Sequence, residues 1–126
     1  MKTEENVAER KMNEYFPEHP VKLLLVDDRE ENLLSLEVVL AATTSTLVKA
    51  HSGREALKIL LTEQDFALIL MDVQMPEMDG FETAEMIRDS ARFPTVPIIF
   101  LTAHHNAPEN IFKGYQAGAV DYILKP

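Results

Sequence analysis

The sequence contains no cysteine, which excludes disulfide bonds, zinc–thiolate centres and thiol nucleophiles. Basic residues are also scarce: 12 Lys and Arg stand against 21 Asp and Glu, and the formal net charge is −9. A phosphate backbone attracts surfaces rich in Lys and Arg, so nucleic acid is not expected as a direct partner. The acidic balance instead suits a protein that holds a cation.

Long apolar runs and glycines are scarce as well. No run approaches the roughly 20 residues of a membrane-spanning helix, so no membrane partner is expected. Residues 1–16 are acidic and lack the apolar core of a signal peptide, so the cytoplasm is the expected location. The four glycines do not form a phosphate-binding loop, which argues against a nucleotide-binding module.

What is present fits one globular domain behind a short leader. The chain has 126 residues, of which 46% are hydrophobic. Residues 1–20 form a charged leader that ends in "FPEHP", whose two prolines discourage a continuous helix into the next segment. We expect the leader to be flexible or to carry a short helix around Val7–Tyr15, and we assign the domain to 21–126.

From Val21 onward, short apolar runs alternate with segments of helical periodicity. The predicted strands are 21–26, 46–50, 66–71, 96–101 and 120–124. The predicted helices are 29–41, 52–64, 80–91 and 108–118. Ser52 and Glu55 form a capping-box pattern at the second helix, and Asp79 is the expected cap of the third.

Strands that are apolar throughout, separated by helices, predict a parallel sheet with helices on both faces. The last expected strand is followed directly by Lys125 and Pro126, so a final helix is missing from the pattern. Part of one face is then expected to be uncovered. We therefore expect either a C-terminal truncation of a longer protein or a partner over this face.

Ligands of open parallel sheets bind beyond the carboxyl ends of the strands. Five chemically useful residues follow the predicted strands, namely Asp27, Asp28, Asp72, Thr102 and Lys125. Each has a structural alternative by itself: Asp28 and Asp72 could cap a helix and a turn, Thr102 could be an ordinary strand residue and Lys125 a solvated charge. Their coincidence at one edge favours a site.

Three neighbouring carboxylates repel one another unless a cation lies between them. Hard oxygen ligands select Mg²⁺ or Mn²⁺ over softer metals, and Mg²⁺ commonly shares its open positions with phosphate. A carboxylate can also attack phosphorus and form an acyl phosphate. We therefore interpret Asp72 as the nucleophile and Asp27 and Asp28 as metal ligands, with Thr102 and Lys125 available to phosphoryl oxygens.

Four segments in this order carry a resemblance: "LLLVDDRE", "LILMDVQMPEMDG", "IIFLTA" and "YQAGAVDYILKP". They resemble the receiver domain of bacterial two-component response regulators, and the likeness covers about Val21 to Pro126. It implies a flavodoxin-like, doubly wound sheet of five parallel strands. It also implies a phosphoacceptor that takes its phosphoryl group from a histidine kinase or a phosphotransfer protein and is not an enzyme in the ordinary sense.

The resemblance implies a role for each site residue. Asp72 is the phosphoacceptor, Asp28 a direct Mg²⁺ ligand and Asp27 a ligand that often acts through water. Gln74 gives its backbone carbonyl to the metal. The remaining implied roles are those of Thr102 and Lys125 at the phosphoryl group, Tyr122 as the switch aromatic, and Gln74 and His104 as residues that influence the dephosphorylation rate.

The missing last helix departs from the family pattern and leaves homodimerisation and the output surface open. The segment "VDDREENLLSLE" is similar to the corresponding segment of receivers fused to sensor kinases or cyclic-dinucleotide enzymes, so a fused or separate output domain is expected.

Other function classes remain as alternatives. A magnesium-dependent phosphatase with an aspartyl-phosphate intermediate usually carries its two acids two residues apart after the first strand, whereas Asp27 and Asp28 are adjacent. An FMN-binding flavodoxin needs a phosphate loop where this chain has "DDREEN". A receiver-like module that only binds proteins would be expected to lack some of the five site residues, and all five are present.

Overall fold

The structure is a computed structural model that describes residues 21–43, 45–63, 65–93, 95–102 and 121–124, the last range by its backbone alone. The leader 1–20 and the predicted helix 108–118 lie outside these residues. The strands are β1 (Val21–Val26), β2 (Ser45–Ala50), β3 (Leu68–Asp72), β4 (Ile98–Thr102) and β5 (Asp121–Leu124). The helices are α2 (Glu30–Leu40), α3 (Gly53–Thr62) and α4 (Gly80–Asp89).

The five strands form one parallel sheet in the order β2-β1-β3-β4-β5. This is the strand order of flavodoxin-like doubly wound folds. Leu23 of β1 lies opposite Leu47 of β2 on one side and Leu68 of β3 on the other, so β1 is an interior strand. The predicted parallel sheet is confirmed.

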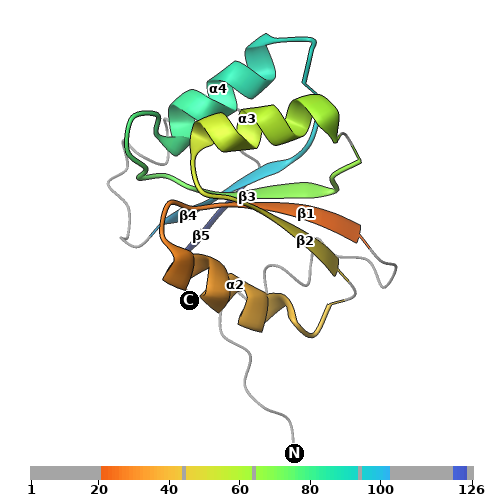
Figure 1. The fold of residues 1–126 in the computed structure, drawn as a ribbon, viewed down its shortest axis with the longest axis vertical. Coiled ribbons are helices and arrows are strands. Elements are labelled where there is room, and N and C mark those ends of the chain that lie inside the picture. The colour runs from red at the N-terminus through yellow and green to blue at the C-terminus, as the bar shows by residue number, and fades with distance from the viewer. Residues whose placement is uncertain (1–20, 44, 64, 94, 103–120, 125–126) are drawn as a thin grey trace, which may run out of the picture.

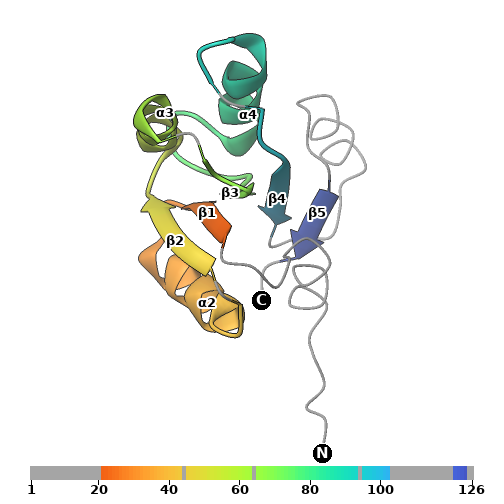
Figure 2. The ribbon, with the colours of Figure 1, turned by 90° about the vertical axis from the view of Figure 1, so that its right-hand side faces the viewer.

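The helices cover both faces of the sheet. Helices α3 and α4 lie side by side on one face, and α2 lies on the opposite face (Figures 1 and 2). The apolar core is divided in the same way, because one buried cluster contains residues of α3 and α4 and the other contains residues of α2. None of the described helices is long and apolar enough to cross a membrane.

Helix α2 shows how its sequence pattern selects a face. Leu33, Leu36 and Leu40 recur at helical spacing and are buried against the sheet. Leu34 and Val38 lie on the outer side, where 50% and 76% of their surface is exposed. The helix is therefore held by one leucine stripe, while its opposite side reaches solvent.

The predicted caps have mixed outcomes. The Asp79 side chain accepts a hydrogen bond from Glu82 N, and the Glu82 side chain accepts one from Asp79 N, which makes a full capping box. Ser52 caps α3 by accepting from Glu55 N. The predicted reciprocal bond is wrong, because the Glu55 carboxylate accepts instead from His51 N at 3.3 Å.

Two predicted strand boundaries are about two residues early. Phe66 and Val96 are apolar and buried, but they precede the paired regions of β3 and β4. Apolar runs in the sequence therefore placed the starts of both strands too early. The strands extend instead through Asp72 and Thr102, so these two site residues belong to the ends of the sheet itself.

Candidate acidic site at the carboxyl end of the sheet

The candidate site lies where the chain leaves adjacent central strands toward opposite faces. Strand β1 leads into α2 on one face, and β3 leads toward α4 on the other (Figure 1). Such a switch point opens a crevice beyond the carboxyl ends of the strands, where ligands of doubly wound sheets bind. Asp27 directly follows β1, and Asp72 ends β3.

Three carboxylates meet at this switch point. One oxygen each from Asp27, Asp28 and Asp72 lies within 4.8 Å of the other two. Asp27 and Asp72 are 0% and 4% exposed, whereas Asp28 reaches solvent. The predicted convergence of these acids is therefore observed, with two acids buried and one exposed.

Asp27 is held by its backbone and its side chain. Its N–H donates to the carbonyl of Ala50 at 3.0 Å, which extends the pairing of β1 with β2 by one residue. Its Oδ1 accepts from Arg29 N at 3.0 Å and from Asn32 Nδ2 at 3.2 Å. Asp27 is thus tied to the first turn of α2, whose N-cap residue is Arg29. The alternative that Asp28 caps this helix is wrong.

Asp72 is fixed by a tight approach between β3 and α4. The N–H of Gly80 donates to the carbonyl of Val73 at 2.8 Å. A Cβ at position 80 would collide with the carbonyl oxygen of Asp72 and lie 3.1 Å from Val73 Cα. Glycine is therefore required for this approach, and the loop 73–79 must return close to the strand that presents Asp72.

The donor set fits a hard divalent cation. Its ligand atoms are carboxylate oxygens, which Mg²⁺ and Mn²⁺ prefer, and no thiol exists in the chain. Two of the carboxylates are almost fully buried, and gathering buried like charges is costly unless an opposite charge compensates them. The residues that could hold the ion are Asp27, Asp28 and Asp72.

The other predicted site residues are placed to different extents. Thr102 is half-buried at the end of β4 and directly follows Leu101, the cross-strand neighbour of Asp72. Gln74 lies two residues after Asp72, and its side chain is exposed. The backbone of Tyr122 in β5 lies opposite Phe100, but its side chain lies outside the described residues. His104 and Lys125 lie outside them entirely.

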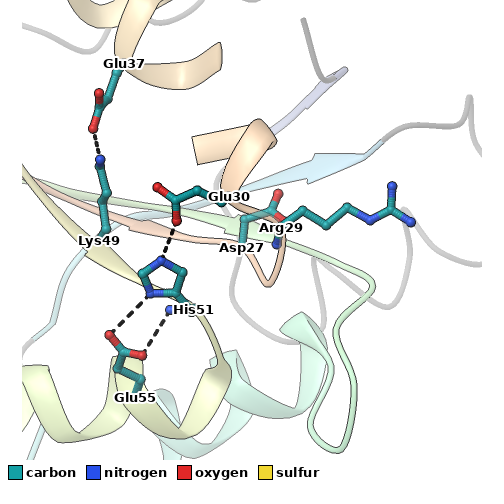
Figure 3. Close-up of polar contacts among 7 residues, drawn as sticks. All are labelled: Asp27, Arg29, Glu30, Glu37, Lys49, His51 and Glu55. Atoms are coloured by element: carbon teal, nitrogen blue, oxygen red, sulfur yellow. Dashed lines mark hydrogen bonds and ion pairs between the residues drawn. The ribbon is translucent and has the colours of Figure 1, made fainter. Parts of the chain in front are cut away.

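The sequence reasoning missed the group around His51 beside this site. Its imidazole Nε2 lies 2.7 Å from a Glu30 oxygen, and its Nδ1 lies 3.6 Å from a Glu55 oxygen (Figure 3). The hydrogen bond with Glu30, and secondarily the charge of Glu55, raise the pKa of His51 above its ordinary value. His51 directly follows β2, so inspecting the end of every strand would have found it.

The comparisons with known proteins agree with this arrangement. The sequence profile of the response regulator receiver domain matches residues 23–126. A Vibrio cholerae protein named "Probable cyclic di-GMP phosphodiesterase" is 38% identical over 104 residues, which cover 82% of this chain and 23% of that protein. The Escherichia coli transcriptional regulatory protein ZraR is 36% identical over 106 residues, or 84% of this chain and 23% of ZraR.

Solved structures give the same likeness. The N-terminal domain of a response regulator receiver protein from Methanoculleus marisnigri has a TM-score of 0.75 and 33% identity. That alignment covers 84% of this chain and 85% of the solved chain. By contrast, this chain spans about a quarter of the length of the two curated relatives above.

Proposed function

This chain belongs to the response regulator receiver family, and on that premise we propose that Asp72 is its phosphoacceptor. The observation that carries the proposal is the position of Asp72: a buried carboxylate at the end of a central strand, with an oxygen within 4.8 Å of carboxylate oxygens of Asp27 and Asp28. A rigid strand end suits a nucleophile, because phosphoryl transfer depends mainly on position and charge.

The proposed donor is the phosphohistidine of a histidine kinase or a phosphotransfer protein. A carboxylate oxygen of Asp72 attacks phosphorus and forms an acyl phosphate. The bond between phosphorus and the imidazole nitrogen breaks, and its electron pair stays with the imidazole, which takes a proton from solvent. The phosphoryl group thereby moves to Asp72 without any further reactant.

We propose that Asp27, Asp28 and Asp72, together with the backbone carbonyl of Gln74, hold Mg²⁺ or Mn²⁺. When bound, the ion neutralises charge on the carboxylates and on the phosphoryl oxygens. The chain's own contribution is to hold these oxygens in place. The Asn32 amide and Arg29 N–H bonded to Asp27 Oδ1 serve this purpose directly.

The remaining predicted residues complete the proposed switch. The hydroxyl group of Thr102 donates a hydrogen bond to a phosphoryl oxygen, and Lys125 supplies a positive charge beside the same group. Tyr122 then changes position and alters the surface near β4 and β5. Gln74 and His104 influence how fast water removes the phosphoryl group.

The partners follow from the same proposal. The kinase or phosphotransfer protein supplies the phosphoryl group, and an output domain, fused or separate, reads the altered surface, with a homodimer as one form of output. The two curated relatives named above are about four times as long as the matched region, which supports an output domain in a longer protein.

The test is incubation with Mg²⁺ and a small acyl phosphate, followed by intact-mass spectrometry. We expect the mass of one added phosphoryl group in the wild-type chain and none in Asp72→Asn. The matched control is Asp65→Asn, which removes an exposed carboxylate from the loop before β3 and should leave the adduct unchanged.

Three results would contradict the proposal. An unmodified wild-type chain would favour a receiver-like module that only binds proteins. A modified Asp72→Asn chain would place the acceptor elsewhere. Sustained turnover of many phosphoesters would favour the phosphatase.

A further inference from the structure

His51 joins the first turns of two helices that lie on opposite faces of the sheet. Its ring lies between Glu30 of α2, at 2.7 Å, and Glu55 of α3, at 3.6 Å (Figure 3). Its backbone N–H donates to Glu55 as well, at 3.3 Å. We refer to the group Glu30, His51 and Glu55 as the histidine clasp. Because the three residues come from different elements, the clasp fixes the entry of α2 relative to that of α3.

The clasp adjoins the bonds that hold Asp27. Ala50, the residue before His51, accepts the N–H of Asp27 at 3.0 Å. Glu30 lies between Arg29 and Asn32, the two donors to Asp27 Oδ1. Any movement of the first turn of α2 that the clasp prevents would therefore move the donors that orient this carboxylate.

A second ion pair, between β2 and α2, lacks this connection to Asp27. Lys49 of β2 pairs with Glu37, which lies two turns further along α2 (Figure 3). It also joins α2 to the strand, but far along the helix from Arg29 and Asn32. The structure therefore contains its own comparison between a contact at the site and a similar contact away from it.

We propose that His51 is a positioning residue for the acidic site: through Glu30 and Glu55 it holds the first turn of α2 so that Asp27 and Asp28 present their carboxylates to the divalent ion. This inference rests on the metal role of these acids in the proposed function. It adds His51, the residue after β2, as a positioning residue of this site.

The direction in which Mg²⁺ affinity changes in His51→Ala distinguishes a positioning role of His51 from an effect of its charge. The charged groups that face His51 are Glu30 of α2 and Glu55 of α3. Removing whatever positive charge the imidazole carries would by charge alone strengthen the binding of a cation, or leave it unchanged. Weaker Mg²⁺ binding in His51→Ala would therefore report the loss of position.

The experiment measures the Mg²⁺ dissociation constant by isothermal titration calorimetry at about 0.15 M salt, where charges more than about 8 Å apart are largely screened. We expect His51→Ala to raise this constant by about two- to five-fold, the range that a surface pair can supply. His51→Gln, whose amide can still donate to Glu30, should recover most of the affinity. Lys49→Met should leave it unchanged.

Amide hydrogen exchange without added metal gives a readout independent of binding. In His51→Ala we expect faster exchange of the Arg29 and Leu33 amides, which bond to Asp27 Oδ1 and to the Arg29 carbonyl. Three results would overturn the positioning role of His51 and leave the proposed function intact. They are an unchanged Mg²⁺ dissociation constant in His51→Ala, an equal loss of affinity in Lys49→Met, and no recovery of affinity in His51→Gln. Equal Mg²⁺ titrations of wild type and Asp28→Asn would overturn the proposed metal site and the inference together.

Discussion

The two ends of the sheet treat charge in opposite ways. At the amino end, Lys22 of β1 pairs with Glu63 at 2.7 Å and Asp65 at 2.8 Å, and its ammonium lies 4.7 Å from the centre of the Phe66 ring. At the carboxyl end, Asp27, Asp28 and Asp72 bring oxygens of like charge within 4.8 Å. The group around Lys22 pairs opposite charges, whereas the acidic site collects equal ones.

The pKa shifts at the amino end show mutual stabilisation. The hydrogen bond to Asp65, followed by that to Glu63, raises the pKa of Lys22, and the same bond to Lys22 lowers the pKa of Asp65. Exposed pairs of this kind contribute little to stability, but they hold the loop before β3 in place. The contrast agrees with the cation site that we propose for the carboxyl end.

Among the variants that test this contrast, Gly80→Ala is expected to change stability and Mg²⁺ binding the most. The new Cβ would collide with the backbone of Asp72, which cannot rotate away, so we expect a loss of about 1–3 kcal/mol in the free energy of unfolding. Urea unfolding measures it. We also expect weaker Mg²⁺ binding, because Asp72 must shift.

Gly53→Ala is the matched control for that variant. A Cβ at position 53 would meet the side chains of Thr83 and Met78 instead of the backbone of the site. It should lower stability and leave the Mg²⁺ dissociation constant near that of the wild type. Equal Mg²⁺ binding in both glycine variants and the wild type would show that the approach of α4 does not position Asp72.

The next effect compares the two ends through their response to Mg²⁺. At a free Mg²⁺ concentration ten times the dissociation constant, a single site adds about 1.4 kcal/mol to the free energy of unfolding. We expect Asp28→Asn to lose most of this gain and, without metal, to be at least as stable as the wild type, since one repelling charge is gone.

Lys22→Met supplies the corresponding change at the amino end. It keeps an unbranched apolar side chain and removes the ammonium that lies over the Phe66 ring. We expect a small loss of stability, and we expect Mg²⁺ to stabilise this variant as much as it stabilises the wild type. Thermal unfolding with and without the ion measures both. The assignment of the Mg²⁺ site to the carboxyl end would be contradicted in two cases. One is a smaller stabilisation by Mg²⁺ in Lys22→Met, and the other is an undiminished stabilisation in Asp28→Asn.

The smallest predicted effect is a dependence on pH that only one end shows. The fold raises the pKa of His51, so its stabilisation is fully present below the ordinary value of 6.5 and is lost as the pH rises through the folded value. The stability difference between wild type and His51→Gln should therefore shrink as the pH rises from about 6, while the difference for Lys22→Met stays flat.

The flat response of Lys22→Met has a physical reason. Near neutral pH, Lys22 stays charged because its pKa is raised from 10.5, and Asp65 stays ionised because its pKa is lowered from 3.8. Urea titrations at several pH values measure both differences. A His51→Gln difference that grows with pH would show that the clasp does not favour the charged imidazole.

The class of fold and the three acids could be predicted because both depend on local pattern. Fully apolar runs such as β3 indicate strands buried on both faces, and the residue that ends such a run must lie at one edge of a parallel sheet. That reasoning predicted Asp27, Asp28 and Asp72 as neighbours before any strand order was known. It also predicted Asp79 as a helix cap, since capping is settled within one turn.

Other features depended on contacts between distant segments. The ends of β3 and β4 at Asp72 and Thr102 were set by their pairing register, and apolar content could not show it. Glu55 completed only half of its predicted capping box because His51, tied also to Glu30, offered its N–H. The need for glycine at position 80 arose from the return of α4 to Asp72.

The sequence by itself therefore determined the alternation of strands and helices, the buried leucine stripe of α2 and the edge at which the acids collect. These follow from side-chain period and from the direction shared by parallel strands. Only the tertiary structure decided that Ala50 accepts the N–H of Asp27 and that His51 links α2 to α3. Such contacts join residues whose proximity is set by packing across the sheet, and no local pattern encodes that distance.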